Sequence, residues 1–186
     1  MTVVETFPTL AEAARAMGPD AIYLGGGTLV MRDVNYGAAP ARILRTSDPA
    51  LREIRVSGEA VALGAGVTMA AILARRELAF LHPVARAVGG PQVRNMATIG
   101  GNLFAPHPYG DVAAALLALG ARVEMAAGGE RPLEDVLRDR ARPSGLVARV
   151  LVATPRPGAF GFLKVGRIKP KGVSVLSVAA HLPREG

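Results

Sequence analysis

The stretch AIYLGGGTLVMRD, residues 21–33, places three consecutive glycines directly after a short apolar run that is typical of a buried strand. Glycine inside an element costs roughly 0.5–1 kcal/mol relative to alanine, so three in succession require a reason. Without a Cβ in the way, successive backbone N–H groups can converge on one anion. The stretch therefore favours a phosphate-binding loop with the Thr28 hydroxyl beside it. A strand-to-helix turn that needs glycine only for steric reasons gives the same pattern.

A second stretch, ATIGGN at residues 97–102, contains similar residue types further along the chain. It supplies the hydroxyl of Thr98, two adjacent glycines and the side-chain amide of Asn102, and we interpret it as a second glycine-bearing loop. One phosphate needs one such loop, whereas two loops on facing subdomains suit a diphosphate and indicate a dinucleotide. Neither loop has the spacing of the Rossmann or Walker A motif.

The composition excludes several kinds of chemistry. The chain has 186 residues, half of them hydrophobic, which suits one domain or two small subdomains that share a core. It has no cysteine, so it can form no disulfide and can ligate no iron–sulfur cluster. The histidines, His82, His107 and His181, are scattered, and we expect no metal site. No serine–histidine–aspartate set or carboxylate pair stands out, so we assign no catalytic residue.

The net charge is +7, which would allow an anionic partner. The basic residues are mostly arginines spread over the chain, with one dense cluster at residues 164–171, and no aromatic platform accompanies them. We therefore expect no nucleic-acid binding. No apolar run approaches the ~20 residues that span a membrane, and the N-terminus lacks a signal-peptide pattern. The sequence predicts a cytoplasmic protein without a membrane span.

The order of apolar patterns and breakers predicts an α+β protein with sheets of short, mixed strands. The first part of the chain suggests a small β-α-β unit, and a hairpin through Ser57-Gly58 opens the next part. A strong helix runs from Asp111, the expected N-cap, to Gly120. We expect a small N-terminal subdomain over residues 1–55 and a larger one over 56–186.

Three segments together carry a resemblance to a known family: YLGGGTLVMRDVN (residues 23–35), VRNMATIGGNLFAPHPYGDVAAALLALGARVEM (93–125) and FLKVGRIKPKGVSVLSVAAHLP (162–183). They resemble the FAD-binding medium subunit of molybdenum hydroxylases of the carbon monoxide dehydrogenase and xanthine dehydrogenase type. The resemblance implies the vanillyl-alcohol-oxidase-like, PCMH-type fold, in which two α/β subdomains hold FAD between them. Members of this family continue into a smaller C-terminal domain, and we expect that domain to be absent from this chain.

The resemblance also implies which residues hold FAD. Asp111 matches the nucleotide-contacting aspartate of the family, although a purely capping role would also explain it. Lys164 matches a lysine near the flavin, where a cation would stabilise the negative charge of the reduced ring; a surface lysine is the alternative. The implied cofactor-binding residues are Leu24, Gly25, Gly26, Gly27, Thr28, Leu29, Val88, Thr98, Ile99, Gly100, Gly101, Asn102, Asp111 and Lys164.

By the same resemblance, the chain is the electron-transfer subunit of a molybdopterin-dependent hydroxylase or dehydrogenase. Its partners would be a molybdopterin-binding large subunit and a small subunit with 2Fe–2S clusters, in a heterotrimer or its dimer. Electrons would pass from those clusters to FAD and then to an external acceptor. Two alternatives stay open: a stand-alone flavin oxidoreductase of the same fold, and a degenerate, non-catalytic assembly module.

Overall fold

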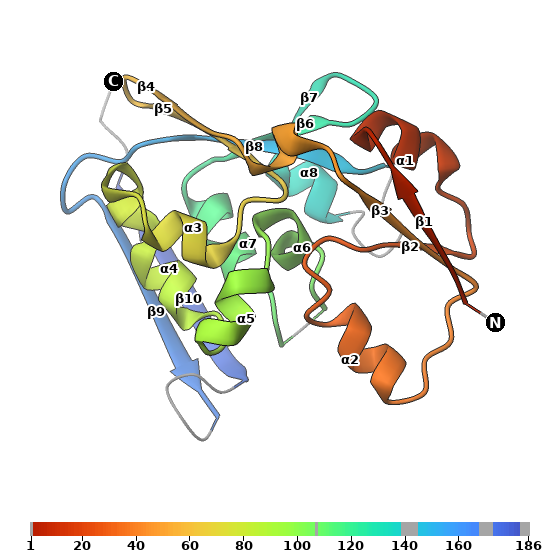
Figure 1. Cartoon of the computed structure of the whole chain (residues 1–186). Helices are drawn as coiled ribbons and strands as arrows, with labels where there is room; N and C mark the ends of the chain where they lie inside the picture. Colours follow the sequence, from red (N-terminus) through yellow and green to blue (C-terminus); the bar gives the residue numbers. More distant parts are fainter. Residues whose placement is uncertain (1, 107, 139–144, 168–172, 183–186) are drawn as a thin grey trace.

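The N-terminal part of the protein is a three-stranded parallel sheet in the order β1-β3-β2 (Figure 1). The computed structural model describes residues 2–106, 108–138, 145–167 and 173–182. Thr9 is the N-cap of the first helix, where a capping box with Glu12 satisfies two backbone N–H groups. The elements of this part are β1 (Val3–Phe7), α1 (Leu10–Ala16), β2 (Ala21–Tyr23), α2 (Val30–Asn35) and β3 (Arg42–Thr46).

A five-stranded antiparallel sheet in the order β4-β5-β8-β6-β7 forms the larger part. The predicted hairpin at Ser57-Gly58 is confirmed, since Gly58 has φ +59° in the turn between the first two of these strands. The strands are β4 (Ile54–Ser57), β5 (Ala60–Gly64), β6 (Arg122–Met125), β7 (Glu130–Pro132) and β8 (Val147–Ala153).

The hydrophobic core lies between this sheet and a group of short helices. Leu63, Val123 and Val150 on the sheet are fully buried, as are Ile99 and Leu116 on the helices. Burial of such side chains contributes roughly 1.5–3 kcal/mol each. The helices are η1 (Pro49–Arg52), α3 (Met69–Leu73), η2 (Arg76–Leu81), α4 (His82–Ala87), α5 (Pro91–Met96), α6 (Ile99–Leu103), α7 (Asp111–Ala118) and α8 (Leu133–Arg138).

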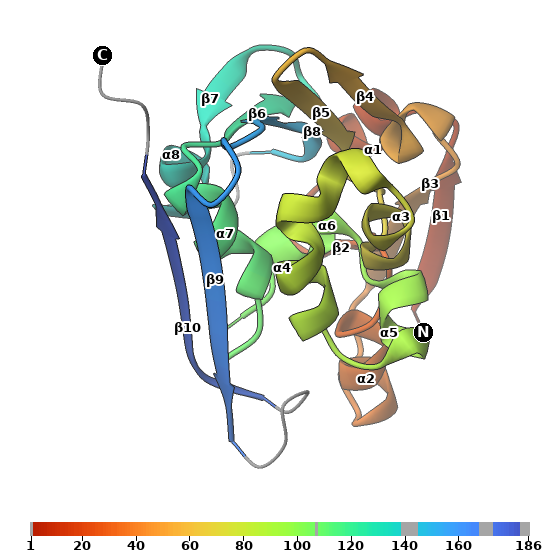
Figure 2. The ribbon, with the colours of Figure 1, turned by 90° about the vertical axis from the view of Figure 1, so that its left-hand side faces the viewer.

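A long hairpin of β9 (Phe160–Gly166) and β10 (Ser174–His181) lies along α7 and α4, as Figure 2 shows. Burial alternates along β9, so Phe162 and Lys164 face the protein and Leu163 faces outward. Strand β9 therefore presents Lys164 to the interior.

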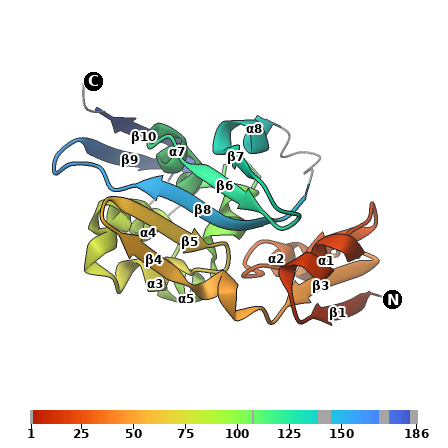
Figure 3. The same cartoon turned by 90° about the horizontal axis from the view of Figure 1, so that it is seen from above.

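The three-stranded sheet lies beside the larger part of the protein (Figure 3). It ends at Thr46, and the five-stranded sheet begins at Ile54. The boundary expected between residues 55 and 56 falls inside β4, and the division into subdomains at that point stays a prediction. Within the described ranges, no helix has the length and apolar character needed to cross a lipid bilayer.

Two local predictions differ from the structure. The ATIGGN segment is the start of helix α6, with Thr98 as its N-cap, and is not a loop. Asp111 is the first residue of α7, and the N-cap is Gly110, whose φ of +94° suits glycine. The Asp111 side chain therefore does not cap the helix. Its carboxylate bonds to other side chains, which are described below.

Candidate functional site

A cleft of about 1310 Å³ is lined by residues of both the N-terminal sheet and the larger part. Its size exceeds the roughly 300–1,000 Å³ of most small-ligand sites, so it suits an extended ligand. With one exception, every residue that the sequence analysis assigned to the cofactor lines this cleft. The lining includes Leu24, Gly25, Gly26, Gly27, Thr28, Leu29, Val88, Thr98, Gly100, Gly101, Asn102, Asp111 and Lys164.

The exception is Ile99. Its side chain is fully buried in the hydrophobic core, and it is absent from the described lining of the cleft. The residue follows the N-cap Thr98, and a helical turn points its side chain away from the neighbouring glycines and toward the core. The Ile99 side chain therefore anchors helix α6, and a contact between Ile99 and the cofactor stays a prediction.

The glycine loop between β2 and α2 offers free hydrogen-bond donors to the cleft. The N–H of Leu24 still bonds to the Leu44 carbonyl at 2.7 Å, which ends the strand pairing. In the described part of the chain, the N–H groups of Gly25, Gly26, Gly27 and Thr28 have no protein acceptor. Backbone donors that are left without a partner beside a cleft are suited to an anionic ligand.

The second motif does not offer such donors. The N–H groups of Ile99 and Gly100 bond to the carbonyls of Val67 and Ala65, at 2.8 and 2.9 Å. The N–H of Gly101 donates to the Thr98 hydroxyl oxygen at 3.1 Å, and that of Asn102 to the Thr98 carbonyl. The expectation of a second loop with free N–H groups is therefore wrong, because the N-cap and a neighbouring loop already accept these hydrogen bonds.

The glycines of the second motif instead let the two segments approach one another. A Cβ added to Gly25 or to Gly101 would lie 3.0 Å from the Thr98 hydroxyl oxygen. A Cβ on Gly101 would also lie 4.0 Å from the Gly26 nitrogen. The cleft is narrow at this point, and the Thr98 hydroxyl lies between the free donors and helix α6.

Three arginines lie near the glycine loop, one of which, Arg32, pairs with Asp33 at 2.7 Å. A second hollow of about 750 Å³ shares the loop residues from Leu24 to Thr28 with the cleft and is also lined by Arg32, Arg45 and Arg52. Arg52 lines both hollows. Several cations near free N–H groups attract an anion more strongly than either feature does alone.

A buried ion pair lies in another part of the cleft. The Lys164 ammonium contacts Oδ2 of Asp111 at 2.7 Å and donates to the Ala87 carbonyl at 3.0 Å. The side chains of Lys164 and Asp111 are 9% and 6% exposed, so Lys164 is not a surface lysine. Asn102 helps to place the pair, because its side-chain oxygen accepts from the Val112 N–H at the start of α7 at 3.0 Å.

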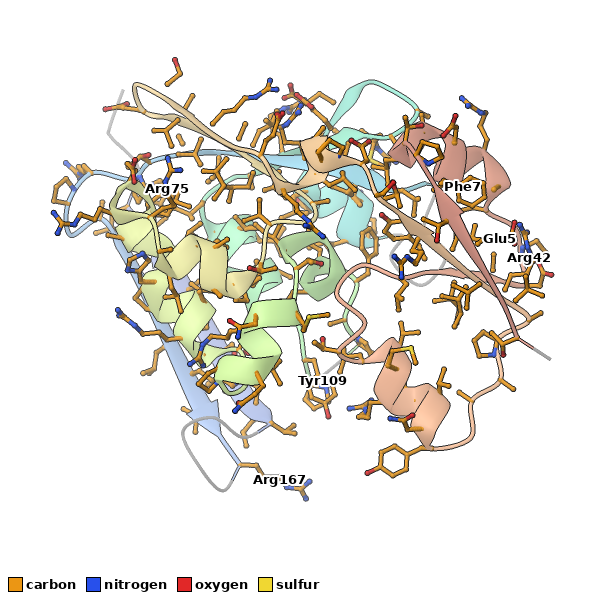
Figure 4. The ribbon with its side chains drawn as sticks, viewed as in Figure 1. Glu5, Phe7, Arg42, Arg75, Tyr109 and Arg167 are labelled. Atoms are coloured by element: carbon orange, nitrogen blue, oxygen red, sulfur yellow. The ribbon has the colours of Figure 1, made fainter. Side chains whose placement is uncertain are left out.

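Several cleft residues were not found from the sequence. Tyr109 contacts Arg32 of helix α2: the Arg32 guanidinium donates to the Tyr109 hydroxyl at 2.7 Å and lies 5.1 Å from the ring centroid. Figure 4 shows Tyr109 close to this helix. Tyr23 also lines the cleft, and burial, with the nearby Asp48 charge, raises its pKa to about 12. Both tyrosines lie inside segments that carry the family resemblance, Tyr23 in residues 23–35 and Tyr109 in residues 93–125, but no local pattern assigns either of them to the cofactor.

Comparison with known proteins agrees with this arrangement. Residues 2–152 match the family described as the FAD binding domain in molybdopterin dehydrogenase. The chain is 32% identical over 109 residues to the carbon monoxide dehydrogenase medium chain of Hydrogenophaga pseudoflava. It is 34% identical over 110 residues to the nicotinate dehydrogenase FAD-subunit of Eubacterium barkeri.

These alignments cover 55% and 56% of this chain but only 38% and 37% of the two relatives. The fold has a solved counterpart in a structure of the Hydrogenophaga pseudoflava carbon monoxide dehydrogenase, with a TM-score of 0.88 and 22% identity. That match covers 100% of this chain and 70% of the other. Because the family model matches most of its length, the chain belongs to the family of FAD-binding domains of molybdopterin dehydrogenases.

Proposed function

We propose that this chain binds FAD along the cleft and transfers electrons within a molybdopterin-dependent dehydrogenase. The observation that carries the proposal is the row of free N–H donors from Gly25 to Thr28, which faces a cleft of about 1310 Å³ and has arginines beside it. A diphosphate carries the negative charge that these donors and cations would bind.

The residues of the cleft fit the parts of FAD. The loop from Leu24 to Leu29 would bind the diphosphate, with the Thr98 hydroxyl and the close-packed Gly100 and Gly101 on the other side. Val88, which is 8% exposed, supplies an apolar part of the cleft wall. By the family resemblance, the flavin end of the cofactor would lie toward Lys164 and Asp111, whose ion pair places a fixed ammonium at the wall of the cleft.

The bound FAD would supply the redox chemistry, accepting two electrons and two protons in full reduction. The chain's own residues would hold the cofactor, exclude water from the buried Lys164–Asp111 pair and keep the ammonium in place. Because the chain has no cysteine, iron–sulfur clusters that deliver electrons would belong to another polypeptide. A molybdopterin-binding large subunit and an iron–sulfur small subunit are the partners that this function requires.

The proposal predicts that purified protein binds FAD in a one-to-one complex. We would titrate the apoprotein with FAD and follow the quenching of flavin fluorescence at two salt concentrations. Binding should weaken at higher salt, because arginines attract the diphosphate. A protein that takes up no FAD at any concentration tested would contradict the proposal and support a non-catalytic assembly module.

The same complex separates electron transfer from a stand-alone oxidase. Simple alcohols should leave the yellow colour of the bound FAD unchanged, whereas reduction should follow when the partner subunits and their substrate are added. Bleaching by an alcohol without any partner would favour the stand-alone flavin oxidoreductase instead.

A further inference from the structure

Two serines of strand β10 connect the outer hairpin to the buried ion pair of the cleft. The Ser177 hydroxyl donates to Oδ1 of Asp111 at 2.5 Å, while Lys164 donates to Oδ2 of the same carboxylate. Ser177 and Ser174 are 2.8 Å apart at their hydroxyl oxygens. Since Ser177 has one hydroxyl proton and gives it to Asp111, Ser174 is the donor between the two serines.

The backbone of the hairpin places these groups together. Ser177 and Lys164 are directly opposite one another in the antiparallel pair, so their side chains lie on the same face and reach the same carboxylate. A register shift between Ser174 and Leu176 adds one residue to β10. Without that shift, residues three apart would point to opposite faces of the strand; with it, Ser174 joins Ser177 on the inner face.

We infer that Ser177 is a positioning residue for the cofactor: it fixes the Asp111 carboxylate, which in turn fixes the Lys164 ammonium at the wall of the cleft. A buried carboxylate with a single donor can rotate toward its remaining partner. The Ser177 hydroxyl occupies Oδ1 and leaves only Oδ2 to Lys164, so the ammonium keeps its second bond to the Ala87 carbonyl. Ser174 supports this geometry by orienting the Ser177 hydroxyl.

This inference rests on the proposed function, because the ammonium acts on bound FAD. A cation held close to the flavin stabilises the negative charge of the reduced ring, which raises its midpoint potential. The loss of the Ser177 hydroxyl should therefore weaken FAD binding and move the midpoint potential to a more negative value.

The test compares Ser177→Thr with Ser177→Val, two side chains of equal shape of which only threonine has a hydroxyl. Both are β-branched and suit a strand, so packing changes affect both variants alike. FAD affinity is measured by fluorescence quenching, the midpoint potential by spectroelectrochemical titration, and the melting temperature of the apoprotein by circular dichroism. Ser57→Ala, at an exposed strand end away from the cleft, is the control for a remote serine.

We expect Ser177→Thr to retain the affinity and potential of the parent protein. Ser177→Val should bind FAD about fivefold or more weakly, a typical size for coupling through a positioning group, and have a more negative potential. Equal affinities and equal potentials in the two variants would overturn the inference while leaving the proposed function intact. Failure of the parent protein to bind FAD would instead contradict the proposed function.

Discussion

Gly26 packs directly against the backbone carbonyl of Met96, the last residue of helix α5. A Cβ added to Gly26 would overlap the carbonyl oxygen and lie 2.7 Å from the carbonyl carbon and 3.2 Å from the Ala97 Cα. Both neighbours are backbone, which cannot move aside as a flexible side chain can. The middle glycine of the triplet is therefore required where the glycine loop touches the chain that leads into α6.

Gly26→Ala should consequently displace the glycine loop. We expect the free energy of unfolding to fall by about 1–3 kcal/mol, the usual cost of overpacking, and FAD affinity to be lost. Denaturant unfolding and FAD titration measure the two effects. Gly161→Ala is the matched control, because a Cβ at Gly161 would meet nothing within 4 Å. A Gly26→Ala protein with unchanged stability would show that the loop does not need this contact.

Gly101→Val tests the side of the cleft that helix α6 forms, opposite the glycine loop. The new side chain would begin 3.0 Å from the Thr98 hydroxyl and extend toward the free N–H groups of the glycine loop. We expect FAD affinity to fall by at least about tenfold, while the circular dichroism spectrum stays that of the folded protein. Unchanged FAD affinity in the folded variant would remove Gly101 from the proposed cofactor site.

The sequence predicts the fold class because local signals agree with one another. The glycine triplet follows a strand, the Ser57-Gly58 turn joins two strands, and helix α7 precedes the positive-φ Gly120. The nature of the TIGGN segment was predicted wrongly because a Thr-x-x-Gly sequence caps a helix as readily as it forms a loop. The decision depends on long-range acceptors, the carbonyls of Ala65 and Val67, which no local pattern contains.

Only part of the candidate site could be predicted from the sequence, and the reason is similar. Backbone-binding motifs are contiguous and can be seen in the sequence, whereas side-chain clusters form only when distant segments meet. Lys164 and Asp111 were named from a family resemblance, but their contact with one another was not predicted. Ser177 has no motif, and the inward orientation of its partner Ser174 depends on a bulge that the alternation of β10 does not reveal.

The Lys164–Asp111 pair provides a test of buried charge. Lys164→Met leaves the Asp111 carboxylate buried without its cation, so the free energy of unfolding should fall by about 3–5 kcal/mol. Adding Asp111→Asn should recover part of that loss, since the uncompensated charge is removed. Urea unfolding of both proteins measures these effects.

Arg138→Met is the matched control for that loss. Arg138 pairs with Glu134 and Asp135 at the protein surface, with its side chain 65% exposed, so its removal should change stability by less than about 1 kcal/mol. Losses of equal size in the Lys164 and Arg138 variants would contradict the importance of the buried pair.

The raised pKa of Tyr23 predicts that the protein loses stability at alkaline pH. Burial raises its pKa to about 12 from the ordinary value of 10.0, so between these values the folded state keeps a proton that the unfolded state releases. Stability from this group is complete below pH 10 and declines as the pH rises toward 12. Denaturation midpoints across this interval should therefore fall less in Tyr23→Phe than in the parent protein. Tyr36→Phe, at a side chain that is 86% exposed, should reproduce the parent profile.

The contact between Arg32 and Tyr109 joins helix α2 of the N-terminal part to the loop before α7, and both residues lie beside the glycine loop or the cleft. Tyr109→Phe removes the hydroxyl that accepts from Arg32 but keeps the ring, whereas Arg32→Ala removes both interactions. Because cation–π contacts and charged hydrogen bonds each stabilise by about 0.5–3 kcal/mol, FAD should dissociate faster in Tyr109→Phe and faster still in Arg32→Ala. Stopped-flow displacement of bound FAD measures both rates.

Arg45→Ala, which removes a charge near the same loop without breaking the contact between Arg32 and Tyr109, separates the effect of charge from that of the contact. If all three variants released FAD at one rate, the connection between the two parts would have no influence on retention of the cofactor.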